Sequence, residues 1–237
     1  MKNFTKNIAI TSILLLASSA IAADRDYNAN YYEEQDSLLF KIRGFYVSAP
    51  TELEKNPTTS GATKVGNMVE VGYGFDTAVT YFLTDHFATE LSLGLASLKV
   101  KSTAMQKAAS AYGDGSGVAT KNNNIYLVPA AAILQYHVAP FGGVRPYVGI
   151  GYHGTYAYTR SKAFKVKPGH GAVAQIGVDF VEKDDTLITF DVRQYFLESK
   201  VTLKRNFLYP SDTTQSAVSS KVKLNPLVIS MGIGFKF

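Results

Sequence analysis

Bulky apolar residues alternate with small or polar residues along much of the chain. From Val71 to Tyr81 the odd positions are mostly bulky, and the even positions carry Gly, Asp, Ala and Thr. The same alternation runs from Leu227 to Phe237. A period of two is typical of a β-strand with one apolar and one polar face. The pattern predicts eight strands, at about 38–48, 71–81, 88–98, 125–138, 145–158, 172–181, 187–197 and 227–237.

The expected strands are long, and the links between them alternate in length. Most strands run about 10–14 residues, enough for a tilted bilayer crossing. Alternation alone does not separate a soluble sandwich from a membrane barrel, but short turns and long external loops are the pattern of bacterial barrels. We therefore predict an all-β fold: an eight-stranded antiparallel transmembrane β-barrel with short periplasmic turns and long external loops. The short links are 84–86, 139–143 and 182–185, and the long ones are 49–68, 99–123, 159–170 and 198–222.

The first residues have the form of an export signal. Lys2 and Lys6 precede a short apolar run, which ends at the small-residue triplet Ala20-Ile21-Ala22. This order predicts a signal peptide at 1–22, which is removed on export. The barrel would then be 23–237, with 23–36 as an acidic periplasmic N-terminal arm, and its location would be the bacterial outer membrane.

Several spaced motifs resemble one family, the OmpW outer-membrane proteins, over essentially the whole mature chain. The resemblance implies an eight-stranded barrel with a narrow, partly apolar channel for small hydrophobic molecules. The family usually carries Trp in its late strands and loops, whereas this chain has none, so the family's lumen constriction is not transferred. The motifs are Arg43-Gly44 with Val47 and Pro50, Thr84-Asp85-His86, Arg145-Pro146-Tyr147-Val148-Gly149-Ile150-Gly151, Gln175-Ile176-Gly177-Val178-Asp179, and Leu224-Asn225-Pro226 running to Phe237.

The charged residues of the strands share the face opposite the bulky residues. A charge that faces lipid at the bilayer midplane costs ~2–4 kcal/mol, so this face should point into the barrel. There the charges are expected to pair into a polar network that fills the lumen. The network is predicted to contain Lys41, Arg43, Asp76, Glu90, Arg145, Asp179, Asp191 and Arg193. Three apolar residues share the inward parity, Leu39, Phe45 and Phe82, and could line a small hydrophobic pocket at one end.

The net charge of +5 is unevenly distributed. The long loops carry an excess of Lys and Arg, whereas the arm and the short turns are acidic. This division, in an exported chain, does not favour nucleic acid as a partner. Basic loops beside the outer leaflet are instead expected to contact lipopolysaccharide phosphates. The candidate residues are Arg160, Lys162, Lys165, Lys167, Lys204 and Arg205.

The chain ends in an aromatic strand, with Phe235 and Phe237 on its apolar face. Outer-membrane barrels are typically presented to their assembly machinery by such a strand. We therefore expect the barrel assembly machinery and outer-membrane lipid as partners.

Candidate chemistry for an enzyme is weak. The chain has no Cys, and the four His lack the spacing of a metal site. His137 and His153 point inward by parity, but no nucleophile beside them is evident. We expect no enzyme, no catalytic residue, no metal and no cofactor. The favoured function is passive passage of a small apolar solute, and the alternative is a structural or surface-interaction barrel whose loops contact host, phage or lipopolysaccharide without transport.

Overall fold

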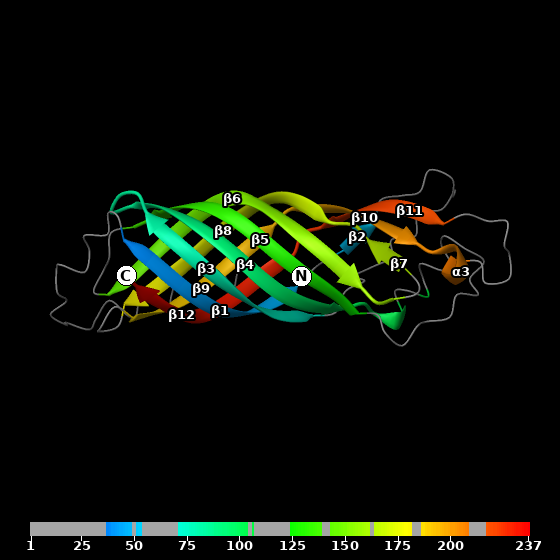
Figure 1. Ribbon diagram of the computed structural model, residues 1–237, viewed down its shortest axis with the longest axis horizontal. Coiled ribbons are helices and arrows are strands. Elements are labelled where there is room, and N and C mark those ends of the chain that lie inside the picture. Colours follow the sequence, from blue (N-terminus) through cyan, green and yellow to red (C-terminus); the bar gives the residue numbers. More distant parts are fainter. Residues whose placement is uncertain are drawn as a thin grey trace, which may run out of the picture.

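Eight long strands form the wall of the molecule and wrap obliquely around one long axis (Figure 1). The computed structural model describes residues 37–48, 51–53, 71–103, 106, 124–138, 143–161, 164–181, 186–208 and 217–237. All eight strands predicted from the alternation are present, with ends that differ by at most a few residues. They are β1 (Leu38–Ser48), β3 (Gly72–Phe82), β4 (Phe87–Lys99), β5 (Asn124–His137), β6 (Val144–Thr159), β8 (Gly169–Val181), β9 (Thr186–Tyr195) and β12 (Leu227–Lys236).

The sheet closes on itself. Neighbours in sequence pair antiparallel from β1 to β12, and β1 then pairs with β12, with Leu39 opposite Lys236 and Ser48 opposite Leu227. At the seam, the backbone N–H of Leu38 donates to the Phe237 carbonyl at 3.2 Å, and the N–H of Phe237 donates to the Leu38 carbonyl at 2.8 Å. Closure leaves the ring of eight strands without an open edge.

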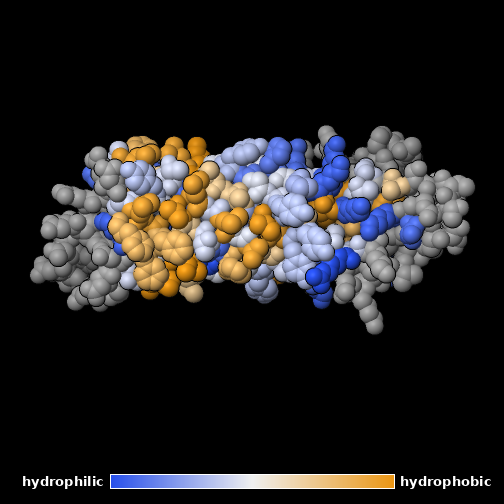
Figure 2. All heavy atoms as spheres, in the orientation of Figure 1, coloured by the Kyte–Doolittle hydropathy of each residue, from blue (hydrophilic) through white to orange (hydrophobic). Residues whose placement is uncertain are grey.

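The outer face of the barrel is apolar. Ile150 is 70% exposed, Tyr73 68% and Leu91 60%, although all three lie within regular strands. Figure 2 shows an apolar belt on the barrel surface, bounded by a more hydrophilic zone toward the loop end. A soluble sandwich would bury this face, whereas a membrane barrel presents it to lipid. The inward face of the same strands carries charged residues, which are buried except for the half-buried Lys236.

The loop end is extended by further short elements: β2 (Thr51–Leu53), β7 (Phe164–Val166), β10 (Leu197–Leu203), helix α3 (Arg205–Leu208) and β11 (Val218–Leu224). The pairing register of β9 with β12 continues into β10 with β11, so that Gln194 lies opposite Leu227 and Leu197 opposite Leu224. The four strands are therefore one long hairpin with a local interruption.

This extension differs from the expectation of a plain loop over 198–222. The reason is the character of its outward side chains. Glu198 and Lys200 are exposed there, while Leu197 and Ser199 are buried. Because these strands lie beyond the apolar belt, their outer face is polar, and the alternation loses the apolar signature that identified the wall strands.

The opposite end is short and tightly connected. Leu83–His86 join β3 to β4, and the backbone N–H groups of His86 and Phe87 donate to the Thr84 hydroxyl at 3.3 and 2.9 Å. Gly143, just before β6, has a φ of 84°, a left-handed conformation that favours glycine. Among the residues that the structure describes, no helix is long and apolar enough to cross a membrane.

Candidate functional site

Arg43 is the centre of a buried ion layer across the lumen. Its guanidinium donates to three carboxylates from three strands: Asp76 at 2.7 Å, Glu90 at 3.0 Å and Asp191 at 3.1 Å. The Arg43 side chain has no exposed surface. The planar guanidinium, with five N–H donors, suits this arrangement, because it can bind several carboxylates at once.

Arg193 joins the same layer from β9. Its Nη2 lies 2.6 Å from Asp76, and its Nε lies 2.8 Å from Asp191. The two arginines therefore share two carboxylates. Arg193 also donates to the hydroxyls of Tyr195 at 3.3 Å and Ser230 at 3.1 Å.

Two glutamines complete the layer on the far side of Glu90. Gln135 Nε2 donates to Glu90 Oε2 at 3.0 Å and to Gln175 Oε1 at 2.9 Å. Both glutamines are buried. The layer thus joins β1, β3, β4, β5, β8 and β9 across the barrel interior, and a solute would have to break it to pass along the axis.

Lys41 and Asp179 form a second ion pair, on the turn side of Arg43. Lys41 Nζ lies 3.0 Å from Asp179 Oδ2 and 4.6 Å from the centre of the Tyr147 ring. The Tyr147 ring lies against Gly177, where an added Cβ would overlap the ring. A glycine at this position makes room for the largest side chain near the ion pair.

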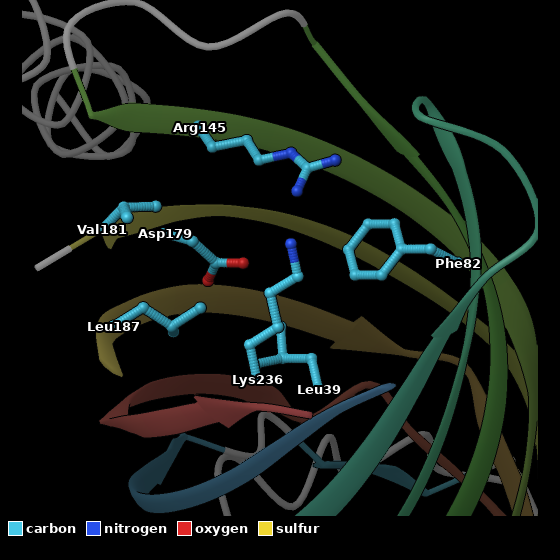
Figure 3. Close-up of a pocket in the computed structure, with 7 residues that line it drawn as sticks. All are labelled: Leu39, Phe82, Arg145, Asp179, Val181, Leu187 and Lys236. Carbon is cyan, nitrogen blue, oxygen red and sulfur yellow. The ribbon is translucent and has the colours of Figure 1, made fainter. Parts of the chain in front are cut away.

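Below this pair, a small cavity opens toward the turn end (Figure 3). The Arg145 guanidinium lies 4.6 Å from the centre of the Phe82 ring, and its Nη2 donates to the Asp85 carbonyl at 2.9 Å. Figure 3 shows Asp179 and Lys236 pointing into the same space, with Leu39 and Leu187 beside them. The empty volume is about 270 Å³, which includes space open to solvent.

A larger and more apolar cavity lies on the loop side of the ion layer. It has an empty volume of about 530 Å³, again including open space. Asp76 and Arg193 of the ion layer border it. Its apolar wall is formed by Phe45, Val47, Ala96, Leu127, Pro129, Leu197, Pro226 and Val228. A cluster of buried apolar side chains, among them Leu98, Ile125 and Phe164, continues this lining toward the loops.

The hydrogen-bonded ladder between β4 and β5 skips two pairs beside this cavity, with the same register on both sides. Pairing of β4 with β5 runs to Leu93 opposite Ala130 and resumes at Ala96 opposite Leu127. Within these two fully described strands, Gly94 and Leu95 have no partner across the ladder. Pro129 would face Gly94, and proline has no N–H to donate. Both Gly94 and Pro129 line the loop-side cavity.

The structure brings together most of the predicted lumen residues. Lys41, Arg43, Asp76, Glu90, Asp179, Asp191 and Arg193 take part in the ion pairs above. Arg145 lies at the turn-side cavity with Asp179. The three predicted apolar residues do not share one pocket: Leu39 and Phe82 line the turn-side cavity, and Phe45 lines the loop-side cavity. Parity identifies the face of the strand but not the level along the barrel axis.

The predicted external basic residues lie at the loop end where the structure describes them. Arg160, Lys165 and Lys167 are exposed. Lys204 is half-buried, and its Nζ donates to the Ser161 carbonyl at 3.4 Å. Lys162 and the side chain of Arg205 lie outside the described residues, as do the predicted signal peptide and acidic arm.

Phe235 and Phe237 point outward, 36% and 80% exposed. Their role as an assembly signal stays a prediction.

Sequence reasoning missed several residues of the lumen. Gln135, Gln175 and Tyr147 are inward and buried, but neutral side chains were not used as a signal. Pro129 had a usable signal, since proline inside a strand marks an interruption of the ladder. Among the described residues, no three His, Asp or Glu side chains form a group that could hold a metal ion.

The chain is similar to a known protein family and to an outer membrane protein of another bacterium. The model of the OmpW family matches residues 34–237. A putative outer membrane protein of Rickettsia conorii is 44% identical over 237 residues, which cover 99% of this chain and 95% of that relative.

Two solved structures share the fold. The outer membrane protein OprG of Pseudomonas aeruginosa superposes with a TM-score of 0.62 at 17% identity, covering 86% of this chain and 97% of OprG. The outer membrane protein AlkL, determined in lipid bilayers, gives a TM-score of 0.60 at 20% identity, covering 91% of this chain and 97% of AlkL. The chain therefore belongs to the OmpW family, whose members are non-enzymatic, and it is an eight-stranded antiparallel β-barrel of the bacterial outer membrane.

Proposed function

We propose that the barrel gives small hydrophobic molecules a passive route from its loop end through the outer leaflet. The family resemblance implies this function. The loop-side lumen supports it, because that half offers an apolar lining to a solute arriving from outside. The route needs no catalytic residue and no cofactor.

A straight path to the turn end is closed to such a solute. The ion layer around Arg43 is buried, and each of its carboxylates accepts from a cation. Moving an apolar solute through it would separate buried charges, each of which costs several kcal/mol when left without its partner (~3–5 kcal/mol). We infer that the solute turns aside above this layer.

The wall interruption supplies the exit. Gly94 and Pro129 line the loop-side cavity, and the ladder between their strands lacks two hydrogen-bonded pairs at this level. The neighbouring outward residues Leu93 and Leu95 are 57% and 49% exposed, so the interruption lies within the apolar belt. A solute that leaves here would enter the lipid directly. The contact of an apolar cavity with an unpaired part of the wall is the observation that carries the proposal.

The test is entry of toluene into vesicles with lipopolysaccharide in the outer leaflet and phospholipid in the inner leaflet. Vesicles with the barrel should take up toluene faster than vesicles without protein. Ala96→Phe should remove most of this gain, because Ala96 is 8% exposed and lines the cavity. Leu91→Phe is the control, since Leu91 faces outward on the same strand, is 60% exposed and lies where pairing with β5 is intact. Equal uptake with and without the barrel would refute the channel.

The basic loop end favours a second function, contact with lipopolysaccharide. Arg160, Lys165 and Lys167 are exposed at the loop end, where phosphate groups of the outer leaflet would lie. Reversing these three charges to Glu should lower the lipopolysaccharide that co-purifies with the barrel. Asp85→Lys, a reversal at the opposite end, should not lower it. Unchanged co-purification in the triple variant would exclude this contact.

A further inference from the structure

The loop-side cavity has a polar side as well as an apolar wall. His153 of β6 lines it and is only 1% exposed. The His153 ring packs edge-on against Tyr195, with ring centroids 4.8 Å apart. Its Nδ1 lies 3.3 Å from the Thr155 hydroxyl, which also lines the cavity. A titratable ring is therefore held by its neighbours on the polar side of the cavity.

The other ring nitrogen lacks a well-formed hydrogen bond. His153 Nε2 is buried and lies beside the backbone of Phe196, but within the described part of the chain no hydrogen bond of good geometry reaches it. A buried polar atom without a hydrogen bond destabilises the empty state, so an occupant that supplies the bond is favoured. The cavity therefore favours a solute that carries a hydrogen-bonding group as well as an apolar body.

His137 shows that this arrangement is specific to one half of the lumen. Its Nδ1 also lacks a partner, and it is fully buried. Its ring, however, is packed against the rings of Phe82 and Tyr147, both at 4.9 Å, and it lines neither cavity. A solute can reach His153 but has no space beside His137.

The head group that fits best is neutral. The cations of the cavity are already engaged: Arg193 binds Asp76 and Asp191, and Asp76 itself borders the cavity. An anionic head would meet the Asp76 carboxylate, and a cationic head would compete with Arg193. A hydroxyl avoids both conflicts.

A hydroxyl also satisfies His153 in either tautomer. If Nδ1 donates to Thr155, Nε2 is an acceptor and receives a hydrogen bond from the hydroxyl group. If Nδ1 accepts from Thr155, Nε2 carries the proton and donates to the hydroxyl oxygen. A carbonyl compound would serve only the second case.

We propose that the loop-side cavity selects small apolar alcohols, and that His153 binds their hydroxyl group. This inference rests on the proposed passage of apolar solutes and names the class that the site prefers. His153 acts here as a specificity-determining residue, with Thr155 holding its ring. The apolar body of the alcohol lies against Phe45, Val47 and Val228.

The experiment compares benzyl alcohol with toluene, which have the same ring and differ in the hydroxyl. In lipid nanodiscs that hold the full barrel, benzyl alcohol should shift the ¹⁵N resonances of the His153 ring, and toluene should not. His137 is the internal control and should be unaffected by both. Equal shifts from the two solutes, or none at His153, would overturn the assignment without any variant having to fold.

Transport gives an independent readout. In the lipopolysaccharide vesicles, His153→Leu should reduce benzyl alcohol entry about five- to tenfold, as expected from loss of one hydrogen bond, and leave toluene entry unchanged. Thr155→Val should reduce it less, because only the orientation of the ring is lost. If wild type and both variants carry the two solutes alike, the selectivity is refuted while the channel stands. If wild-type barrels carry neither solute faster than empty vesicles do, the channel itself fails.

Discussion

The two halves of the lumen differ in how they are filled. The turn-side half is closed by buried ion pairs, of Arg43 with Asp76 and Glu90 and of Lys41 with Asp179. The loop-side half is lined by apolar side chains and leaves a cavity beside an interrupted part of the wall. One alternation of residues produces both, because the inward positions carry charged residues at one level and apolar residues at another. In the proposed function, the turn-side half stabilises the barrel and the loop-side half receives the solute.

The strongest way to break this comparison is to remove the centre of the ion layer. Arg43→Met leaves Glu90 without its arginine and leaves Asp76 and Asp191 with Arg193 alone, and the free energy of unfolding should fall by ~3–5 kcal/mol. Urea unfolding of the barrel in lipid vesicles measures the change. Lys200→Met, at an exposed lysine of β10, should alter stability by no more than ~0.5 kcal/mol. Similar small losses in the two variants would mean that the ion layer does not stabilise the turn-side half.

The turn-side half should also resist added volume. Gly177→Ala places a methyl group against the Tyr147 ring, which packs beside Lys41. Overpacking of this kind should lower the free energy of unfolding by ~1–3 kcal/mol. Gly44→Ala is the control, since an added Cβ there meets nothing within 4 Å. If Gly177→Ala and Gly44→Ala change the free energy of unfolding equally, the Tyr147 ring is not tightly packed against Gly177.

Two valines of similar burial, one at each cavity, allow the two halves to be compared by the same small change. Val228 lines the loop-side cavity and Val181 the turn-side cavity, and they are 6% and 7% exposed. Each change to Ala should cost about 1–2 kcal/mol, the value expected for two buried methyl groups. Toluene entry should rise in Val228→Ala and stay at the wild-type rate in Val181→Ala. A rise in Val181→Ala would show that solute also passes the turn-side half.

The sequence determines much of this structure directly. Alternation from Val71 to Tyr81 and from Leu227 to Phe237 located wall strands, and the cost of lipid-facing charge placed Arg43 and Asp76 inside. Two features escaped it for physical reasons. The polar outer face of Glu198 and Lys200 hid the extension beyond the membrane. The alternation of inward and outward positions is the same along the whole barrel axis, so it did not show that Phe45 and Phe82 line different cavities.

The contacts of neutral residues were also beyond prediction. Gln135 and Gln175 meet through strands β5 and β8, which are not neighbours in the sheet. His153 is distinguished from His137 only by which of them lines a cavity. Such differences depend on barrel geometry across strands, and no spacing within one strand encodes them.

The central claim is that solute leaves sideways between β4 and β5 rather than along the axis. Because the chain has no Cys, a disulfide can be introduced cleanly. The pair Leu95→Cys and Val128→Cys would span the interruption, and Leu91→Cys with Ala132→Cys joins the same strands where pairing is intact. Toluene entry should fall to the level of empty vesicles when the first pair is oxidised, recover on reduction, and remain unchanged with the second pair. Undiminished entry through the oxidised first pair would contradict the account.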